Sequence, residues 1–472
     1  MKQSTRIGTA LFKPGGSSAL AEFAADLSFS AIPDVVLERA RLHILDGLGL
    51  ALASGKHPFA AAAIAAAQEL AGGTGLCSVI GHAARLPPRD AALVNGILIH
   101  GLDFDDTHQQ AIVHPTAACL PAILALAEAR NATGKDLLTA YCIGMEAAIR
   151  IGASVKSGFH HAGFHATSVV AHFSSALSAG RLMNLDKHGL IAAQGIAAST
   201  ASGVQVFLEE GAWTKRFHPG WAAVAGITAA TLAKNDFKAP SRPYEGQFGL
   251  YETHLQAHRD KVDESFLSSD LGSVWMTVDT ALKPYPVCHF IHGAAEAAIL
   301  LHSEIKGAKI ASVEVLLGAD SLPIIADPIE AKRRASNEYE AKFSAPFVVA
   351  TALLRGRFGL AELTDEAIAA TDVQALAKRV SCAPDPHSQF PIYFSGDVRV
   401  KLADGRELCH NIPVNSGAGD RQLDEAAVTK KFMANAAPVL GEAQSDKLKQ
   451  VVLDLENIQA RELANLFSAV AQ

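Results

Sequence analysis

From about residue 18 to residue 235, this sequence alternates alanine-rich segments with short junctions of glycine, proline and histidine. Apolar residues recur at i, i+3, i+4 and i+7 in these segments, which is the spacing of one face of an α-helix. Alanine is the strongest helix former and lets neighbouring helices approach closely. The pattern therefore predicts a compact all-helical domain, with its clearest helical segments at 33–53, 89–104, 121–130 and 135–153.

The pattern changes after about residue 270. Residues 311–318 (ASVEVLLG) have the β-branched content of a strand, and residues 397–414 alternate like two strands around an Asp-Gly turn. Helical spacing returns in residues 424–440 and 442–458. We therefore expect a mainly α fold in which a smaller α+β domain, about 271–414, precedes a final helical stretch. The pattern alone leaves open whether that stretch rejoins the first domain.

Length and composition narrow the class of protein. A chain of 472 residues is too long for one ordinary core, so we expect two domains. Apolar residues make up 49% and charged residues 19%, which is typical of a globular protein. The net charge of −7 and the lack of a long basic run disfavour a nucleic-acid partner.

The sequence also bears on location and redox chemistry. No apolar run reaches the roughly 18 residues that span a bilayer, and the first residues lack the apolar core of a signal peptide. We therefore expect a cytoplasmic protein with no membrane partner. The six cysteines are scattered without a C-x-x-C motif, which fits reduced thiols and argues against a cysteine-held zinc or iron–sulfur site.

Histidines gather at the junctions between expected helices. The chain has 19 histidines, and nine of them lie between His100 and His218. Four junctions place cationic or imidazole groups beside an expected helix start, where free N–H groups and the helix dipole favour anions. They carry His114; His165; Lys215 with Arg216 and His218, before the helix expected from Pro219; and His289 with His292. Any one of these could be an ordinary core or surface histidine, but together they predict a pocket for a polyanion.

The segment HGLDFDDTHQQAIVHPTAA, residues 100–118, adds carboxylates to this set. If it is helical, His100, Asp103 and Thr107 share one face. An inward carboxylate at Asp103 could hold a neighbouring imidazole in one tautomer. Asp106 and Thr107 fit a helix-terminal cap or turn as well as they fit a direct chemical role.

Several other classes of protein were weighed. DFDDTH resembles the magnesium-binding motif of helical prenyl-diphosphate enzymes, but Gln109 and Gln110 follow where a further acid is needed. Histidine and carboxylate ligands suit zinc, although no H-E-x-x-H motif is present. A non-catalytic helical scaffold would leave the grouped histidines unexplained, and a periplasmic-type binding protein would need an export signal. Thermal stability with a chelator and with small polycarboxylates would separate these classes.

Five motifs in series resemble the MmgE/PrpD family, which includes 2-methylcitrate dehydratase, cis-aconitate decarboxylase and iminodisuccinate epimerase. They are HGLDFDDTH…VHPTA, GFHATSVVA, WTKRFHPGWAA, KPYPVCHFIHGAAEAA and VRVKLADGRE, in family order between about residues 30 and 435. The resemblance implies a helical domain built from both ends of the chain, residues 1–270 and 415–472, and an α+β lid of residues 271–414. It also implies a homodimer that needs no metal and no other cofactor.

The resemblance to the decarboxylase-like members also implies site residues. We expect catalytic roles for Asp103, His165, Lys215 and His292. We expect substrate binding by Thr107, His114, Arg216, Tyr285 and His289. In this interpretation Lys215 neutralises substrate carboxylates, a neutral His165 moves a proton on the carbon beside a carboxylate, and Asp103 orients a histidine.

The predicted function is a metal-independent lyase, a dehydratase or decarboxylase, acting on a small di- or tricarboxylate of the 2-methylcitrate or cis-aconitate type. The alternative is an epimerase of an iminodisuccinate-like dicarboxylate. GFHATS favours the decarboxylase and epimerase branch, whereas HQQAIVHPT departs from the WHPATHPS-like link of the decarboxylases. The sequence therefore does not determine which acid is the substrate or which bond is broken.

Overall fold

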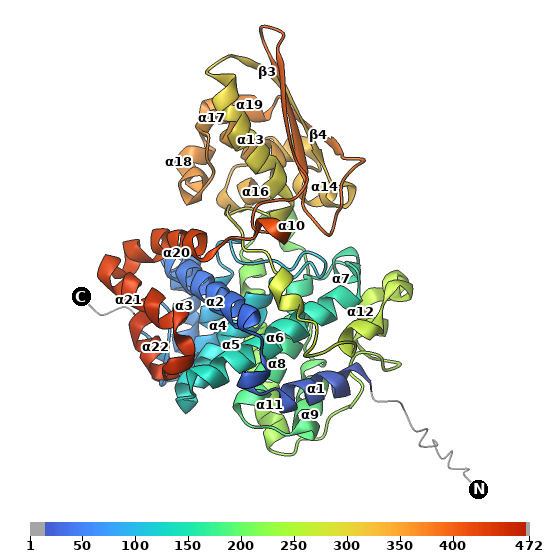
Figure 1. The fold of residues 1–472 in the computed structure, drawn as a ribbon, viewed down its shortest axis with the longest axis vertical. Coiled ribbons are helices and arrows are strands. Elements are labelled where there is room, and N and C mark those ends of the chain that lie inside the picture. The colour runs from blue at the N-terminus through green and yellow to red at the C-terminus, as the bar shows by residue number, and fades with distance from the viewer. Residues whose placement is uncertain (1–14, 469–472) are drawn as a thin grey trace.

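Helices dominate the structure. The computed structural model describes residues 15–468, and most of them lie in α-helices. The six strands of this part of the chain form a two-stranded and a four-stranded sheet. Figure 1 shows a larger helical part and, above it, a smaller part in which helices pack beside the four-stranded sheet. The mainly α fold expected from the sequence is confirmed.

The larger part is a bundle of long, alanine-rich helices with shorter ones around it. The long helices are α2 (Asp34–Ser54), α3 (Pro58–Ala71), α4 (Pro88–Ile99), α5 (Pro115–Arg130), α6 (Gly134–Ser154), α8 (Ala166–Leu182) and α11 (Thr214–Lys234). The shorter elements are α1 (Gly16–Asp26), α7 (Gly158–His161), α9 (Lys187–Ala197), α10 (Phe207–Glu210), α12 (Leu250–Leu255), β1 (Cys77–Ser78) and β2 (Arg85–Leu86). Within residues 15–468 no helix has both the length and the apolar character needed to cross a membrane.

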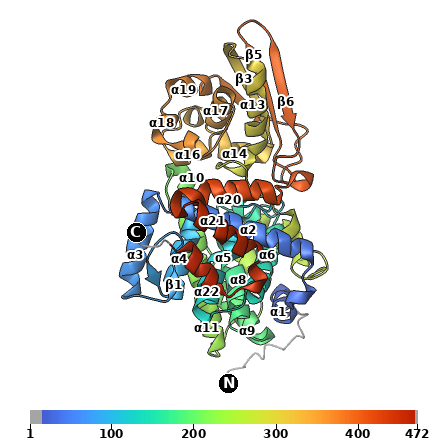
Figure 2. The same ribbon diagram turned by 60° about the vertical axis from the view of Figure 1, so that its left-hand side comes forward.

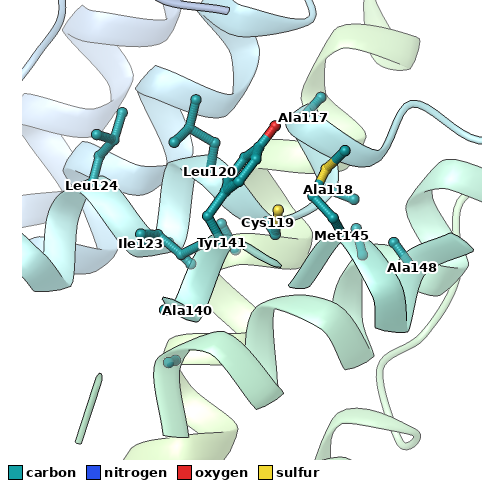
Figure 3. Close-up of a cluster of buried hydrophobic side chains, with 14 of the residues drawn as sticks. Ala117, Ala118, Cys119, Leu120, Ile123, Leu124, Ala140, Tyr141, Met145 and Ala148 are labelled. Atoms are coloured by element: carbon teal, nitrogen blue, oxygen red, sulfur yellow. The ribbon is translucent and has the colours of Figure 1, made fainter. Parts of the chain in front are cut away.

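The helices start where local chemistry favours a start. Proline occupies the first turn of α4 and of α5, where its missing N–H costs no hydrogen bond. At α6 the Thr133 and Asp136 side chains bind each other's backbone N–H groups, which satisfies donors that the helix leaves free. Figure 3 shows the packing that follows, with Tyr141 of α6 beside Leu120 of α5 and Met145 of α6 near Ala118 of α5.

Both ends of the described chain contribute to one hydrophobic cluster. The helices α20 (Glu425–Leu440), α21 (Glu442–Leu453) and α22 (Ala460–Phe467) pack on the larger part, and α20 lies along α2. Phe432 of α20 sits so close to Gly49 of α2 that a Cβ there would lie 2.9 Å from its ring. Figures 1 and 2 show these C-terminal helices, in red, beside the blue N-terminal ones. The domain boundaries at 270/271 and 414/415 stay a prediction.

The smaller part is built on a mixed sheet with strand order β4-β3-β5-β6. β3 (Ile310–Leu317) pairs in parallel with β4 (Val380–Pro384) and antiparallel with β5 (Gly396–Leu402), which forms a hairpin with β6 (Glu407–Ile412). Gly405 in the turn has φ 93°, so the Asp-Gly turn and its two strands are confirmed. The helices are α13 (His292–Ile305), α14 (Leu322–Ile325), α15 (Ile329–Lys332), α16 (Glu338–Lys342), α17 (Ala345–Arg355), α18 (Asp365–Ile368) and α19 (Thr371–Ala377).

A second hydrophobic cluster, formed mainly by residues 287–412, fills the smaller part. Ile112, between α4 and α5, and Phe207, the first residue of α10, also belong to this cluster. The two parts therefore meet across a packed boundary, and the histidine-bearing junctions lie at this boundary.

One close helix approach in the larger part joins α4 to α11. A Cβ built on Gly96 would lie 2.5 Å from the Cα of Gly220 and 2.6 Å from its nitrogen. Both atoms are backbone, so a side chain at residue 96 would push the two helices apart.

We predict that Gly96→Ala lowers the free energy of unfolding by about 1–3 kcal/mol, because the added methyl group forces strain into a close-packed contact. Urea unfolding followed by circular dichroism measures the change. The matched control is Gly73→Ala, since a Cβ there meets nothing within 4 Å. Equal stability of the two variants would contradict the proposed contact.

Candidate active site

The segment between α4 and α5 is a series of turns, not a helix. α4 ends at Ile99, and Asp103 adopts the left-handed conformation with φ 52°. The helix expected over residues 89–104 is therefore wrong in its last turn, and the expected helical face shared by His100, Asp103 and Thr107 is not formed. The segment nevertheless keeps Asp103 and Thr107 on the wall of one cavity.

Three buried lysines explain why this segment leaves the helix. Lys342 donates to the carbonyl oxygen of Leu102 at 2.8 Å, and Lys283 to that of Asp103 at 2.7 Å. Lys431 donates to the carbonyl oxygen of Phe104 at 2.9 Å. Three successive carbonyl groups thus find charged donors from α16, from the chain before α13 and from α20. The sequence reasoning missed these lysines, because nothing in the local pattern marks them as buried.

Asp103 is the centre of a buried ion cluster. Its Oδ1 accepts hydrogen bonds from Lys215 Nζ at 2.8 Å and Lys283 Nζ at 3.0 Å. Burial alone would raise the pKa of this carboxyl, but the two ammonium groups hold it well below its usual range. Two ammonium groups thus face one carboxylate within this cluster, and the Asp105 carboxylate has an oxygen within 4.8 Å of an Asp103 oxygen. The Oδ2 atom has no hydrogen-bond partner among the described residues.

Backbone pairing brings Lys283 to this cluster. Thr107 and Ala281 exchange both backbone hydrogen bonds, at 2.8 and 2.9 Å. Lys283 follows Ala281 by two positions, so this bridge brings Lys283 beside the turn that contains Asp103. A pairing between segments 174 positions apart in the chain is invisible to a local pattern, which is why Lys283 was not singled out.

Asp106 has the capping role that the sequence left open. Its carboxylate accepts hydrogen bonds from the backbone N–H and the hydroxyl of Thr116, in the first turn of α5. His43 Nδ1 lies 2.8 Å from Asp106 Oδ2, and the Thr116 hydroxyl also contacts Tyr141. Asp106 therefore anchors α5 to the core and lies outside the cavity. Thr107 does line the cavity, with its hydroxyl 3.3 Å from His114 Nδ1.

Two histidines occupy helix starts as expected. His114 precedes α5 and His165 precedes α8, each at the N-cap position. The Nδ1 of His114 donates to the Asp106 carbonyl oxygen at 2.7 Å, so its Nε2 carries the lone pair. That atom lies 4.0 Å from Asp103 Oδ1. His165 Nδ1 is 3.0 Å from His218 Nδ1, so Nε2 is the ring nitrogen of His165 that this contact does not occupy.

The α11 junction differs in one detail from the expectation. We expected Lys215, Arg216 and His218 to precede a helix that begins at Pro219. The helix instead begins at Thr214 and contains Pro219, so these three residues belong to its first two turns. Pro219 is the sixth residue of this helix, so it supplies no N–H group to the Lys215 carbonyl oxygen one turn earlier.

A carboxylate does hold one imidazole, but through a different pair from the one expected. His100 Nδ1 lies 2.8 Å from Asp105 Oδ2, whereas the hydrogen bonds of the Asp103 carboxylate go to the two lysines. The His100 ring lies behind the cavity wall, with its centroid 4.8 Å from that of His114 and 5.7 Å from that of His165.

The imidazoles around this site are neutral at physiological pH. Burial lowers the pKa of His114 and His165 well below its usual value, and the Lys215 ammonium acts in the same direction. Burial also lowers the pKa of His160 and His218 to about 4. A neutral imidazole can accept a proton, so the site holds several potential bases beside two ammonium groups.

Six of the nine residues predicted for the site line one buried cavity with a free space of about 60 Å³. They are Asp103, Thr107, His114, His165, Lys215 and His289. Residues that the sequence reasoning did not propose complete its wall, among them Lys283, His160 and Cys288.

The other three predicted residues lie beside or outside the cavity. His292 is directly behind His289, with ring centroids 4.4 Å apart, and Tyr285 packs on His292 at 5.3 Å. Arg216 faces away into a neighbouring pocket, where its guanidinium lies 4.3 Å from the Phe59 ring centre and 3.5 Å from the Glu338 carboxylate. Only the tertiary structure shows that Arg216, which adjoins Lys215 in the chain, faces this neighbouring pocket.

Two groups of side chains in the described part of the chain could converge on a metal ion. One is His100, His114 and His165, and the other is Asp103, Asp105 and His114. In each group the ligand atoms lie within 4.8 Å of one another. A cation bound to Asp103 would compete with the two ammonium groups that already occupy its Oδ1.

The buried neutral histidines make stability depend on pH. Burial lowers the pKa of His108, His160 and His172 to about 4, whereas an unfolded histidine titrates near 6.5. Above pH 6.5 both states are neutral. Between pH 6.5 and about 4 the unfolded state binds protons that the folded state excludes, so the free energy of unfolding falls as the pH falls.

We predict that His172→Asn makes this fall shallower by about 1.4 kcal/mol per pH unit between pH 6 and pH 4.5. Asparagine keeps a donor for the Ser168 carbonyl oxygen, which His172 Nδ1 contacts at 2.8 Å, but does not titrate. Urea unfolding at several pH values measures the slope. The exposed His188→Asn is the control, and a slope that both variants leave unchanged would contradict the prediction.

The sequence also matches known protein families and individual proteins. Residues 18–263 match the MmgE/PrpD N-terminal domain, and residues 285–457 match the MmgE/PrpD C-terminal domain. Cis-aconitate decarboxylase of Aspergillus terreus is 25% identical over 94% of each chain. The human cis-aconitate decarboxylase is 29% identical over 79% of this chain and 78% of its own. The 2-methylcitrate dehydratase of Salmonella typhimurium is 24% identical over 93% of this chain and 95% of its own.

The two matched domains cover most of the chain. Together with these relatives they show that the chain is an enzyme of the MmgE/PrpD type. The chain belongs to the MmgE/PrpD family.

Proposed function

We propose that this chain is a lyase, a dehydratase or decarboxylase, that acts on a small di- or tricarboxylate of the 2-methylcitrate or cis-aconitate type. The relatives named cis-aconitate decarboxylase and 2-methylcitrate dehydratase support this class of reaction. The observation that carries the proposal is the cavity in which Lys215 and Lys283 share one carboxylate beside neutral imidazoles. The mechanism uses these side chains and assigns no step to a metal or cofactor.

The ammonium groups bind the substrate in this proposal. The ion cluster sets two ammonium groups, Lys215 and Lys283, against the single carboxylate of Asp103, so an incoming carboxylate can pair with them as well. Ammonium groups are compact partners for carboxylates, and the starts of α5 and α8 add N–H groups and a favourable dipole. Exclusion of water from this buried site strengthens each of these interactions.

The imidazoles move the proton. His165 is the proposed base, because it is neutral, lines the cavity and has Nδ1 occupied by His218. His114 presents the Nε2 lone pair near Asp103 and can act on the same substrate. Negative charge that develops on a substrate carboxylate would be stabilised by Lys215 and Lys283.

We predict that Lys215→Ala raises KM about 10- to 100-fold, because a hydrogen bond between charged groups is lost. We expect His165→Ala to lower kcat by about 10²- to 10⁴-fold, the usual contribution of general acid–base catalysis. Steady-state kinetics on the active substrate measures both. The controls are Lys234→Ala, exposed on the same helix, and the exposed His161→Ala. Full activity of Lys215→Ala and His165→Ala would refute the assigned roles.

An epimerase remains the second candidate, because His114 and His165 supply two potential acid–base groups in one cavity. NMR in deuterated water distinguishes the reactions when the purified protein is incubated with 2-methylcitrate, citrate, cis-aconitate or iminodisuccinate. We expect a new alkene or a lost carboxylate for the lyase. Deuterium incorporation without net product would instead support the epimerase.

We also propose that the chain is a homodimer in the cytoplasm. Trp213, Phe217 and Trp221 lie at i, i+4 and i+8 on α11 with exposed fractions of 50%, 40% and 43%. An aromatic stripe of this kind is typical of a protein–protein interface. α11 also carries Lys215, so a partner on this stripe would stabilise the helix that positions the ion cluster.

We predict that Trp221→Glu shifts the protein from dimer to monomer, because a carboxylate in an apolar interface loses its hydration without a partner. Sedimentation velocity measures the mass. The control is Phe248→Glu, which changes an aromatic side chain that is 84% exposed outside the α11 stripe. A wild-type monomer, or a Trp221→Glu variant that stays dimeric, would contradict the proposed interface.

A further inference from the structure

His289 is connected to a hydrogen-bond chain that the proposed mechanism does not use. It lies just before α13, and its ring forms part of the cavity wall. Its Nε2 is 3.0 Å from the side-chain Nδ2 of Asn415, which is fully buried in the connection between β6 and α20. The second ring nitrogen, Nδ1, is buried and has no hydrogen-bond partner among residues 15–468.

The backbone fixes which way the Asn415 amide points. The N–H of Phe394 lies 3.0 Å from Asn415 Oδ1, and a backbone N–H can only donate. Gln109 Nε2 also donates to this oxygen, at 3.1 Å. The oxygen side of the amide is therefore defined, and the NH₂ side faces His289. An amide NH₂ has no acceptor capacity, so Asn415 donates to His289 Nε2.

The acceptor role of Nε2 determines the tautomer of the ring. Because a neutral imidazole carries one proton, a ring that accepts at Nε2 carries its proton on Nδ1. The adjacent His292 has the opposite arrangement. Its Nε2 donates to the Val287 carbonyl oxygen at 3.3 Å, which leaves the lone pair on Nδ1. At this helix start, Nδ1 of His289 is therefore an N–H donor, whereas Nδ1 of the neighbouring His292 carries a lone pair.

We infer that Asn415 and Gln109 are positioning residues that hold His289 as an Nδ1–H donor for a carboxylate oxygen of the substrate. This inference rests on the proposed function, which puts a polycarboxylate in the cavity. An N–H group that is buried without a partner costs free energy, and a substrate oxygen beside Lys283 would satisfy it. His289 then binds the acid and does not act as the base.

The chain of hydrogen bonds also joins distant parts of the molecule. Gln109 belongs to the turns between α4 and α5, and Asn415 is 306 positions away. Phe394, which precedes β5, packs its ring edge on His289 with centroids 5.0 Å apart. The tautomer of His289 is therefore set only when the smaller part, the α20 connection and the helical part are assembled.

The tautomer can be tested without any assumption about activity. Two-bond ¹⁵N–¹H correlation spectra of protein labelled with ¹⁵N-histidine distinguish the two tautomers, and the signal missing in His289→Leu identifies the residue. We expect Nδ1–H in the wild-type protein. We expect the Nε2–H form or an imidazolium in Asn415→Asp, since a carboxylate can only accept. An Nε2–H tautomer in the wild-type protein would overturn the inference whatever the activity.

Kinetics and calorimetry with cis-aconitate and 2-methylcitrate test the donor role. We expect His289→Leu to raise KM about tenfold or more while kcat stays within about threefold, because a hydrogen bond to a charged group is lost. We expect His289→Asn to keep KM near the wild-type value, since its amide NH₂ can replace Nδ1–H. Asn415→Asp should raise KM as His289→Leu does.

The outcomes separate the two proposals. Equal KM values for His289→Leu and His289→Asn would overturn the donor role, and so would a fall in kcat alone. A wild-type protein that shows the Nδ1–H tautomer but neither binds nor converts the two acids would count against the proposed function and against a carboxylate as the acceptor.

Discussion

The site depends on one carboxylate buried between two ammonium groups. A charged group in a protein interior is costly unless it is paired, and Asp103 satisfies this requirement with Lys215 from α11 and Lys283 from the chain before α13. Because the lysines come from different parts of the molecule, the cluster connects the helical bundle to the smaller part. The two ammonium groups that it brings together are what make the cavity suited to an acid.

The turn that carries Asp103 is shaped by the same kind of interaction. A helix continuing through residues 102–104 would use their carbonyl groups internally, but Lys342, Lys283 and Lys431 donate to them instead. A hydrogen bond from a charged donor is roughly twice as strong as a neutral one, which compensates for ending the helix. The left-handed conformation of Asp103 then directs its carboxylate to the lysines and away from the axis of α4.

Burial keeps the histidines neutral, and their hydrogen-bond partners determine which ring nitrogen carries the proton. Desolvation and nearby ammonium groups keep the rings neutral, so each ring has one donor and one acceptor nitrogen. A backbone carbonyl takes the Nδ1 proton of His114, whereas the Asn415 amide occupies Nε2 of His289. One residue type can therefore provide both a base and a hydrogen-bond donor within a single cavity.

Much of the local structure could be predicted from the sequence. Prolines and periodic alanines located the starts of α5 and α8 at His114 and His165, and the Asp-Gly turn located the β5–β6 hairpin. The residues that the family resemblance implied include six that line the cavity. These features depend on hydrogen bonds and side-chain periodicity within a few residues, so a linear pattern contains them.

The sequence by itself determined the helical class, the helix starts that carry histidine and the family. Only the tertiary structure decided that Lys283 completes the ion cluster, that Arg216 faces another pocket and that Asn415 meets His289. The physical reason is that a buried charge or imidazole takes its state from its partners. Those partners are brought together by helix packing across hundreds of residues, and no local pattern records that packing.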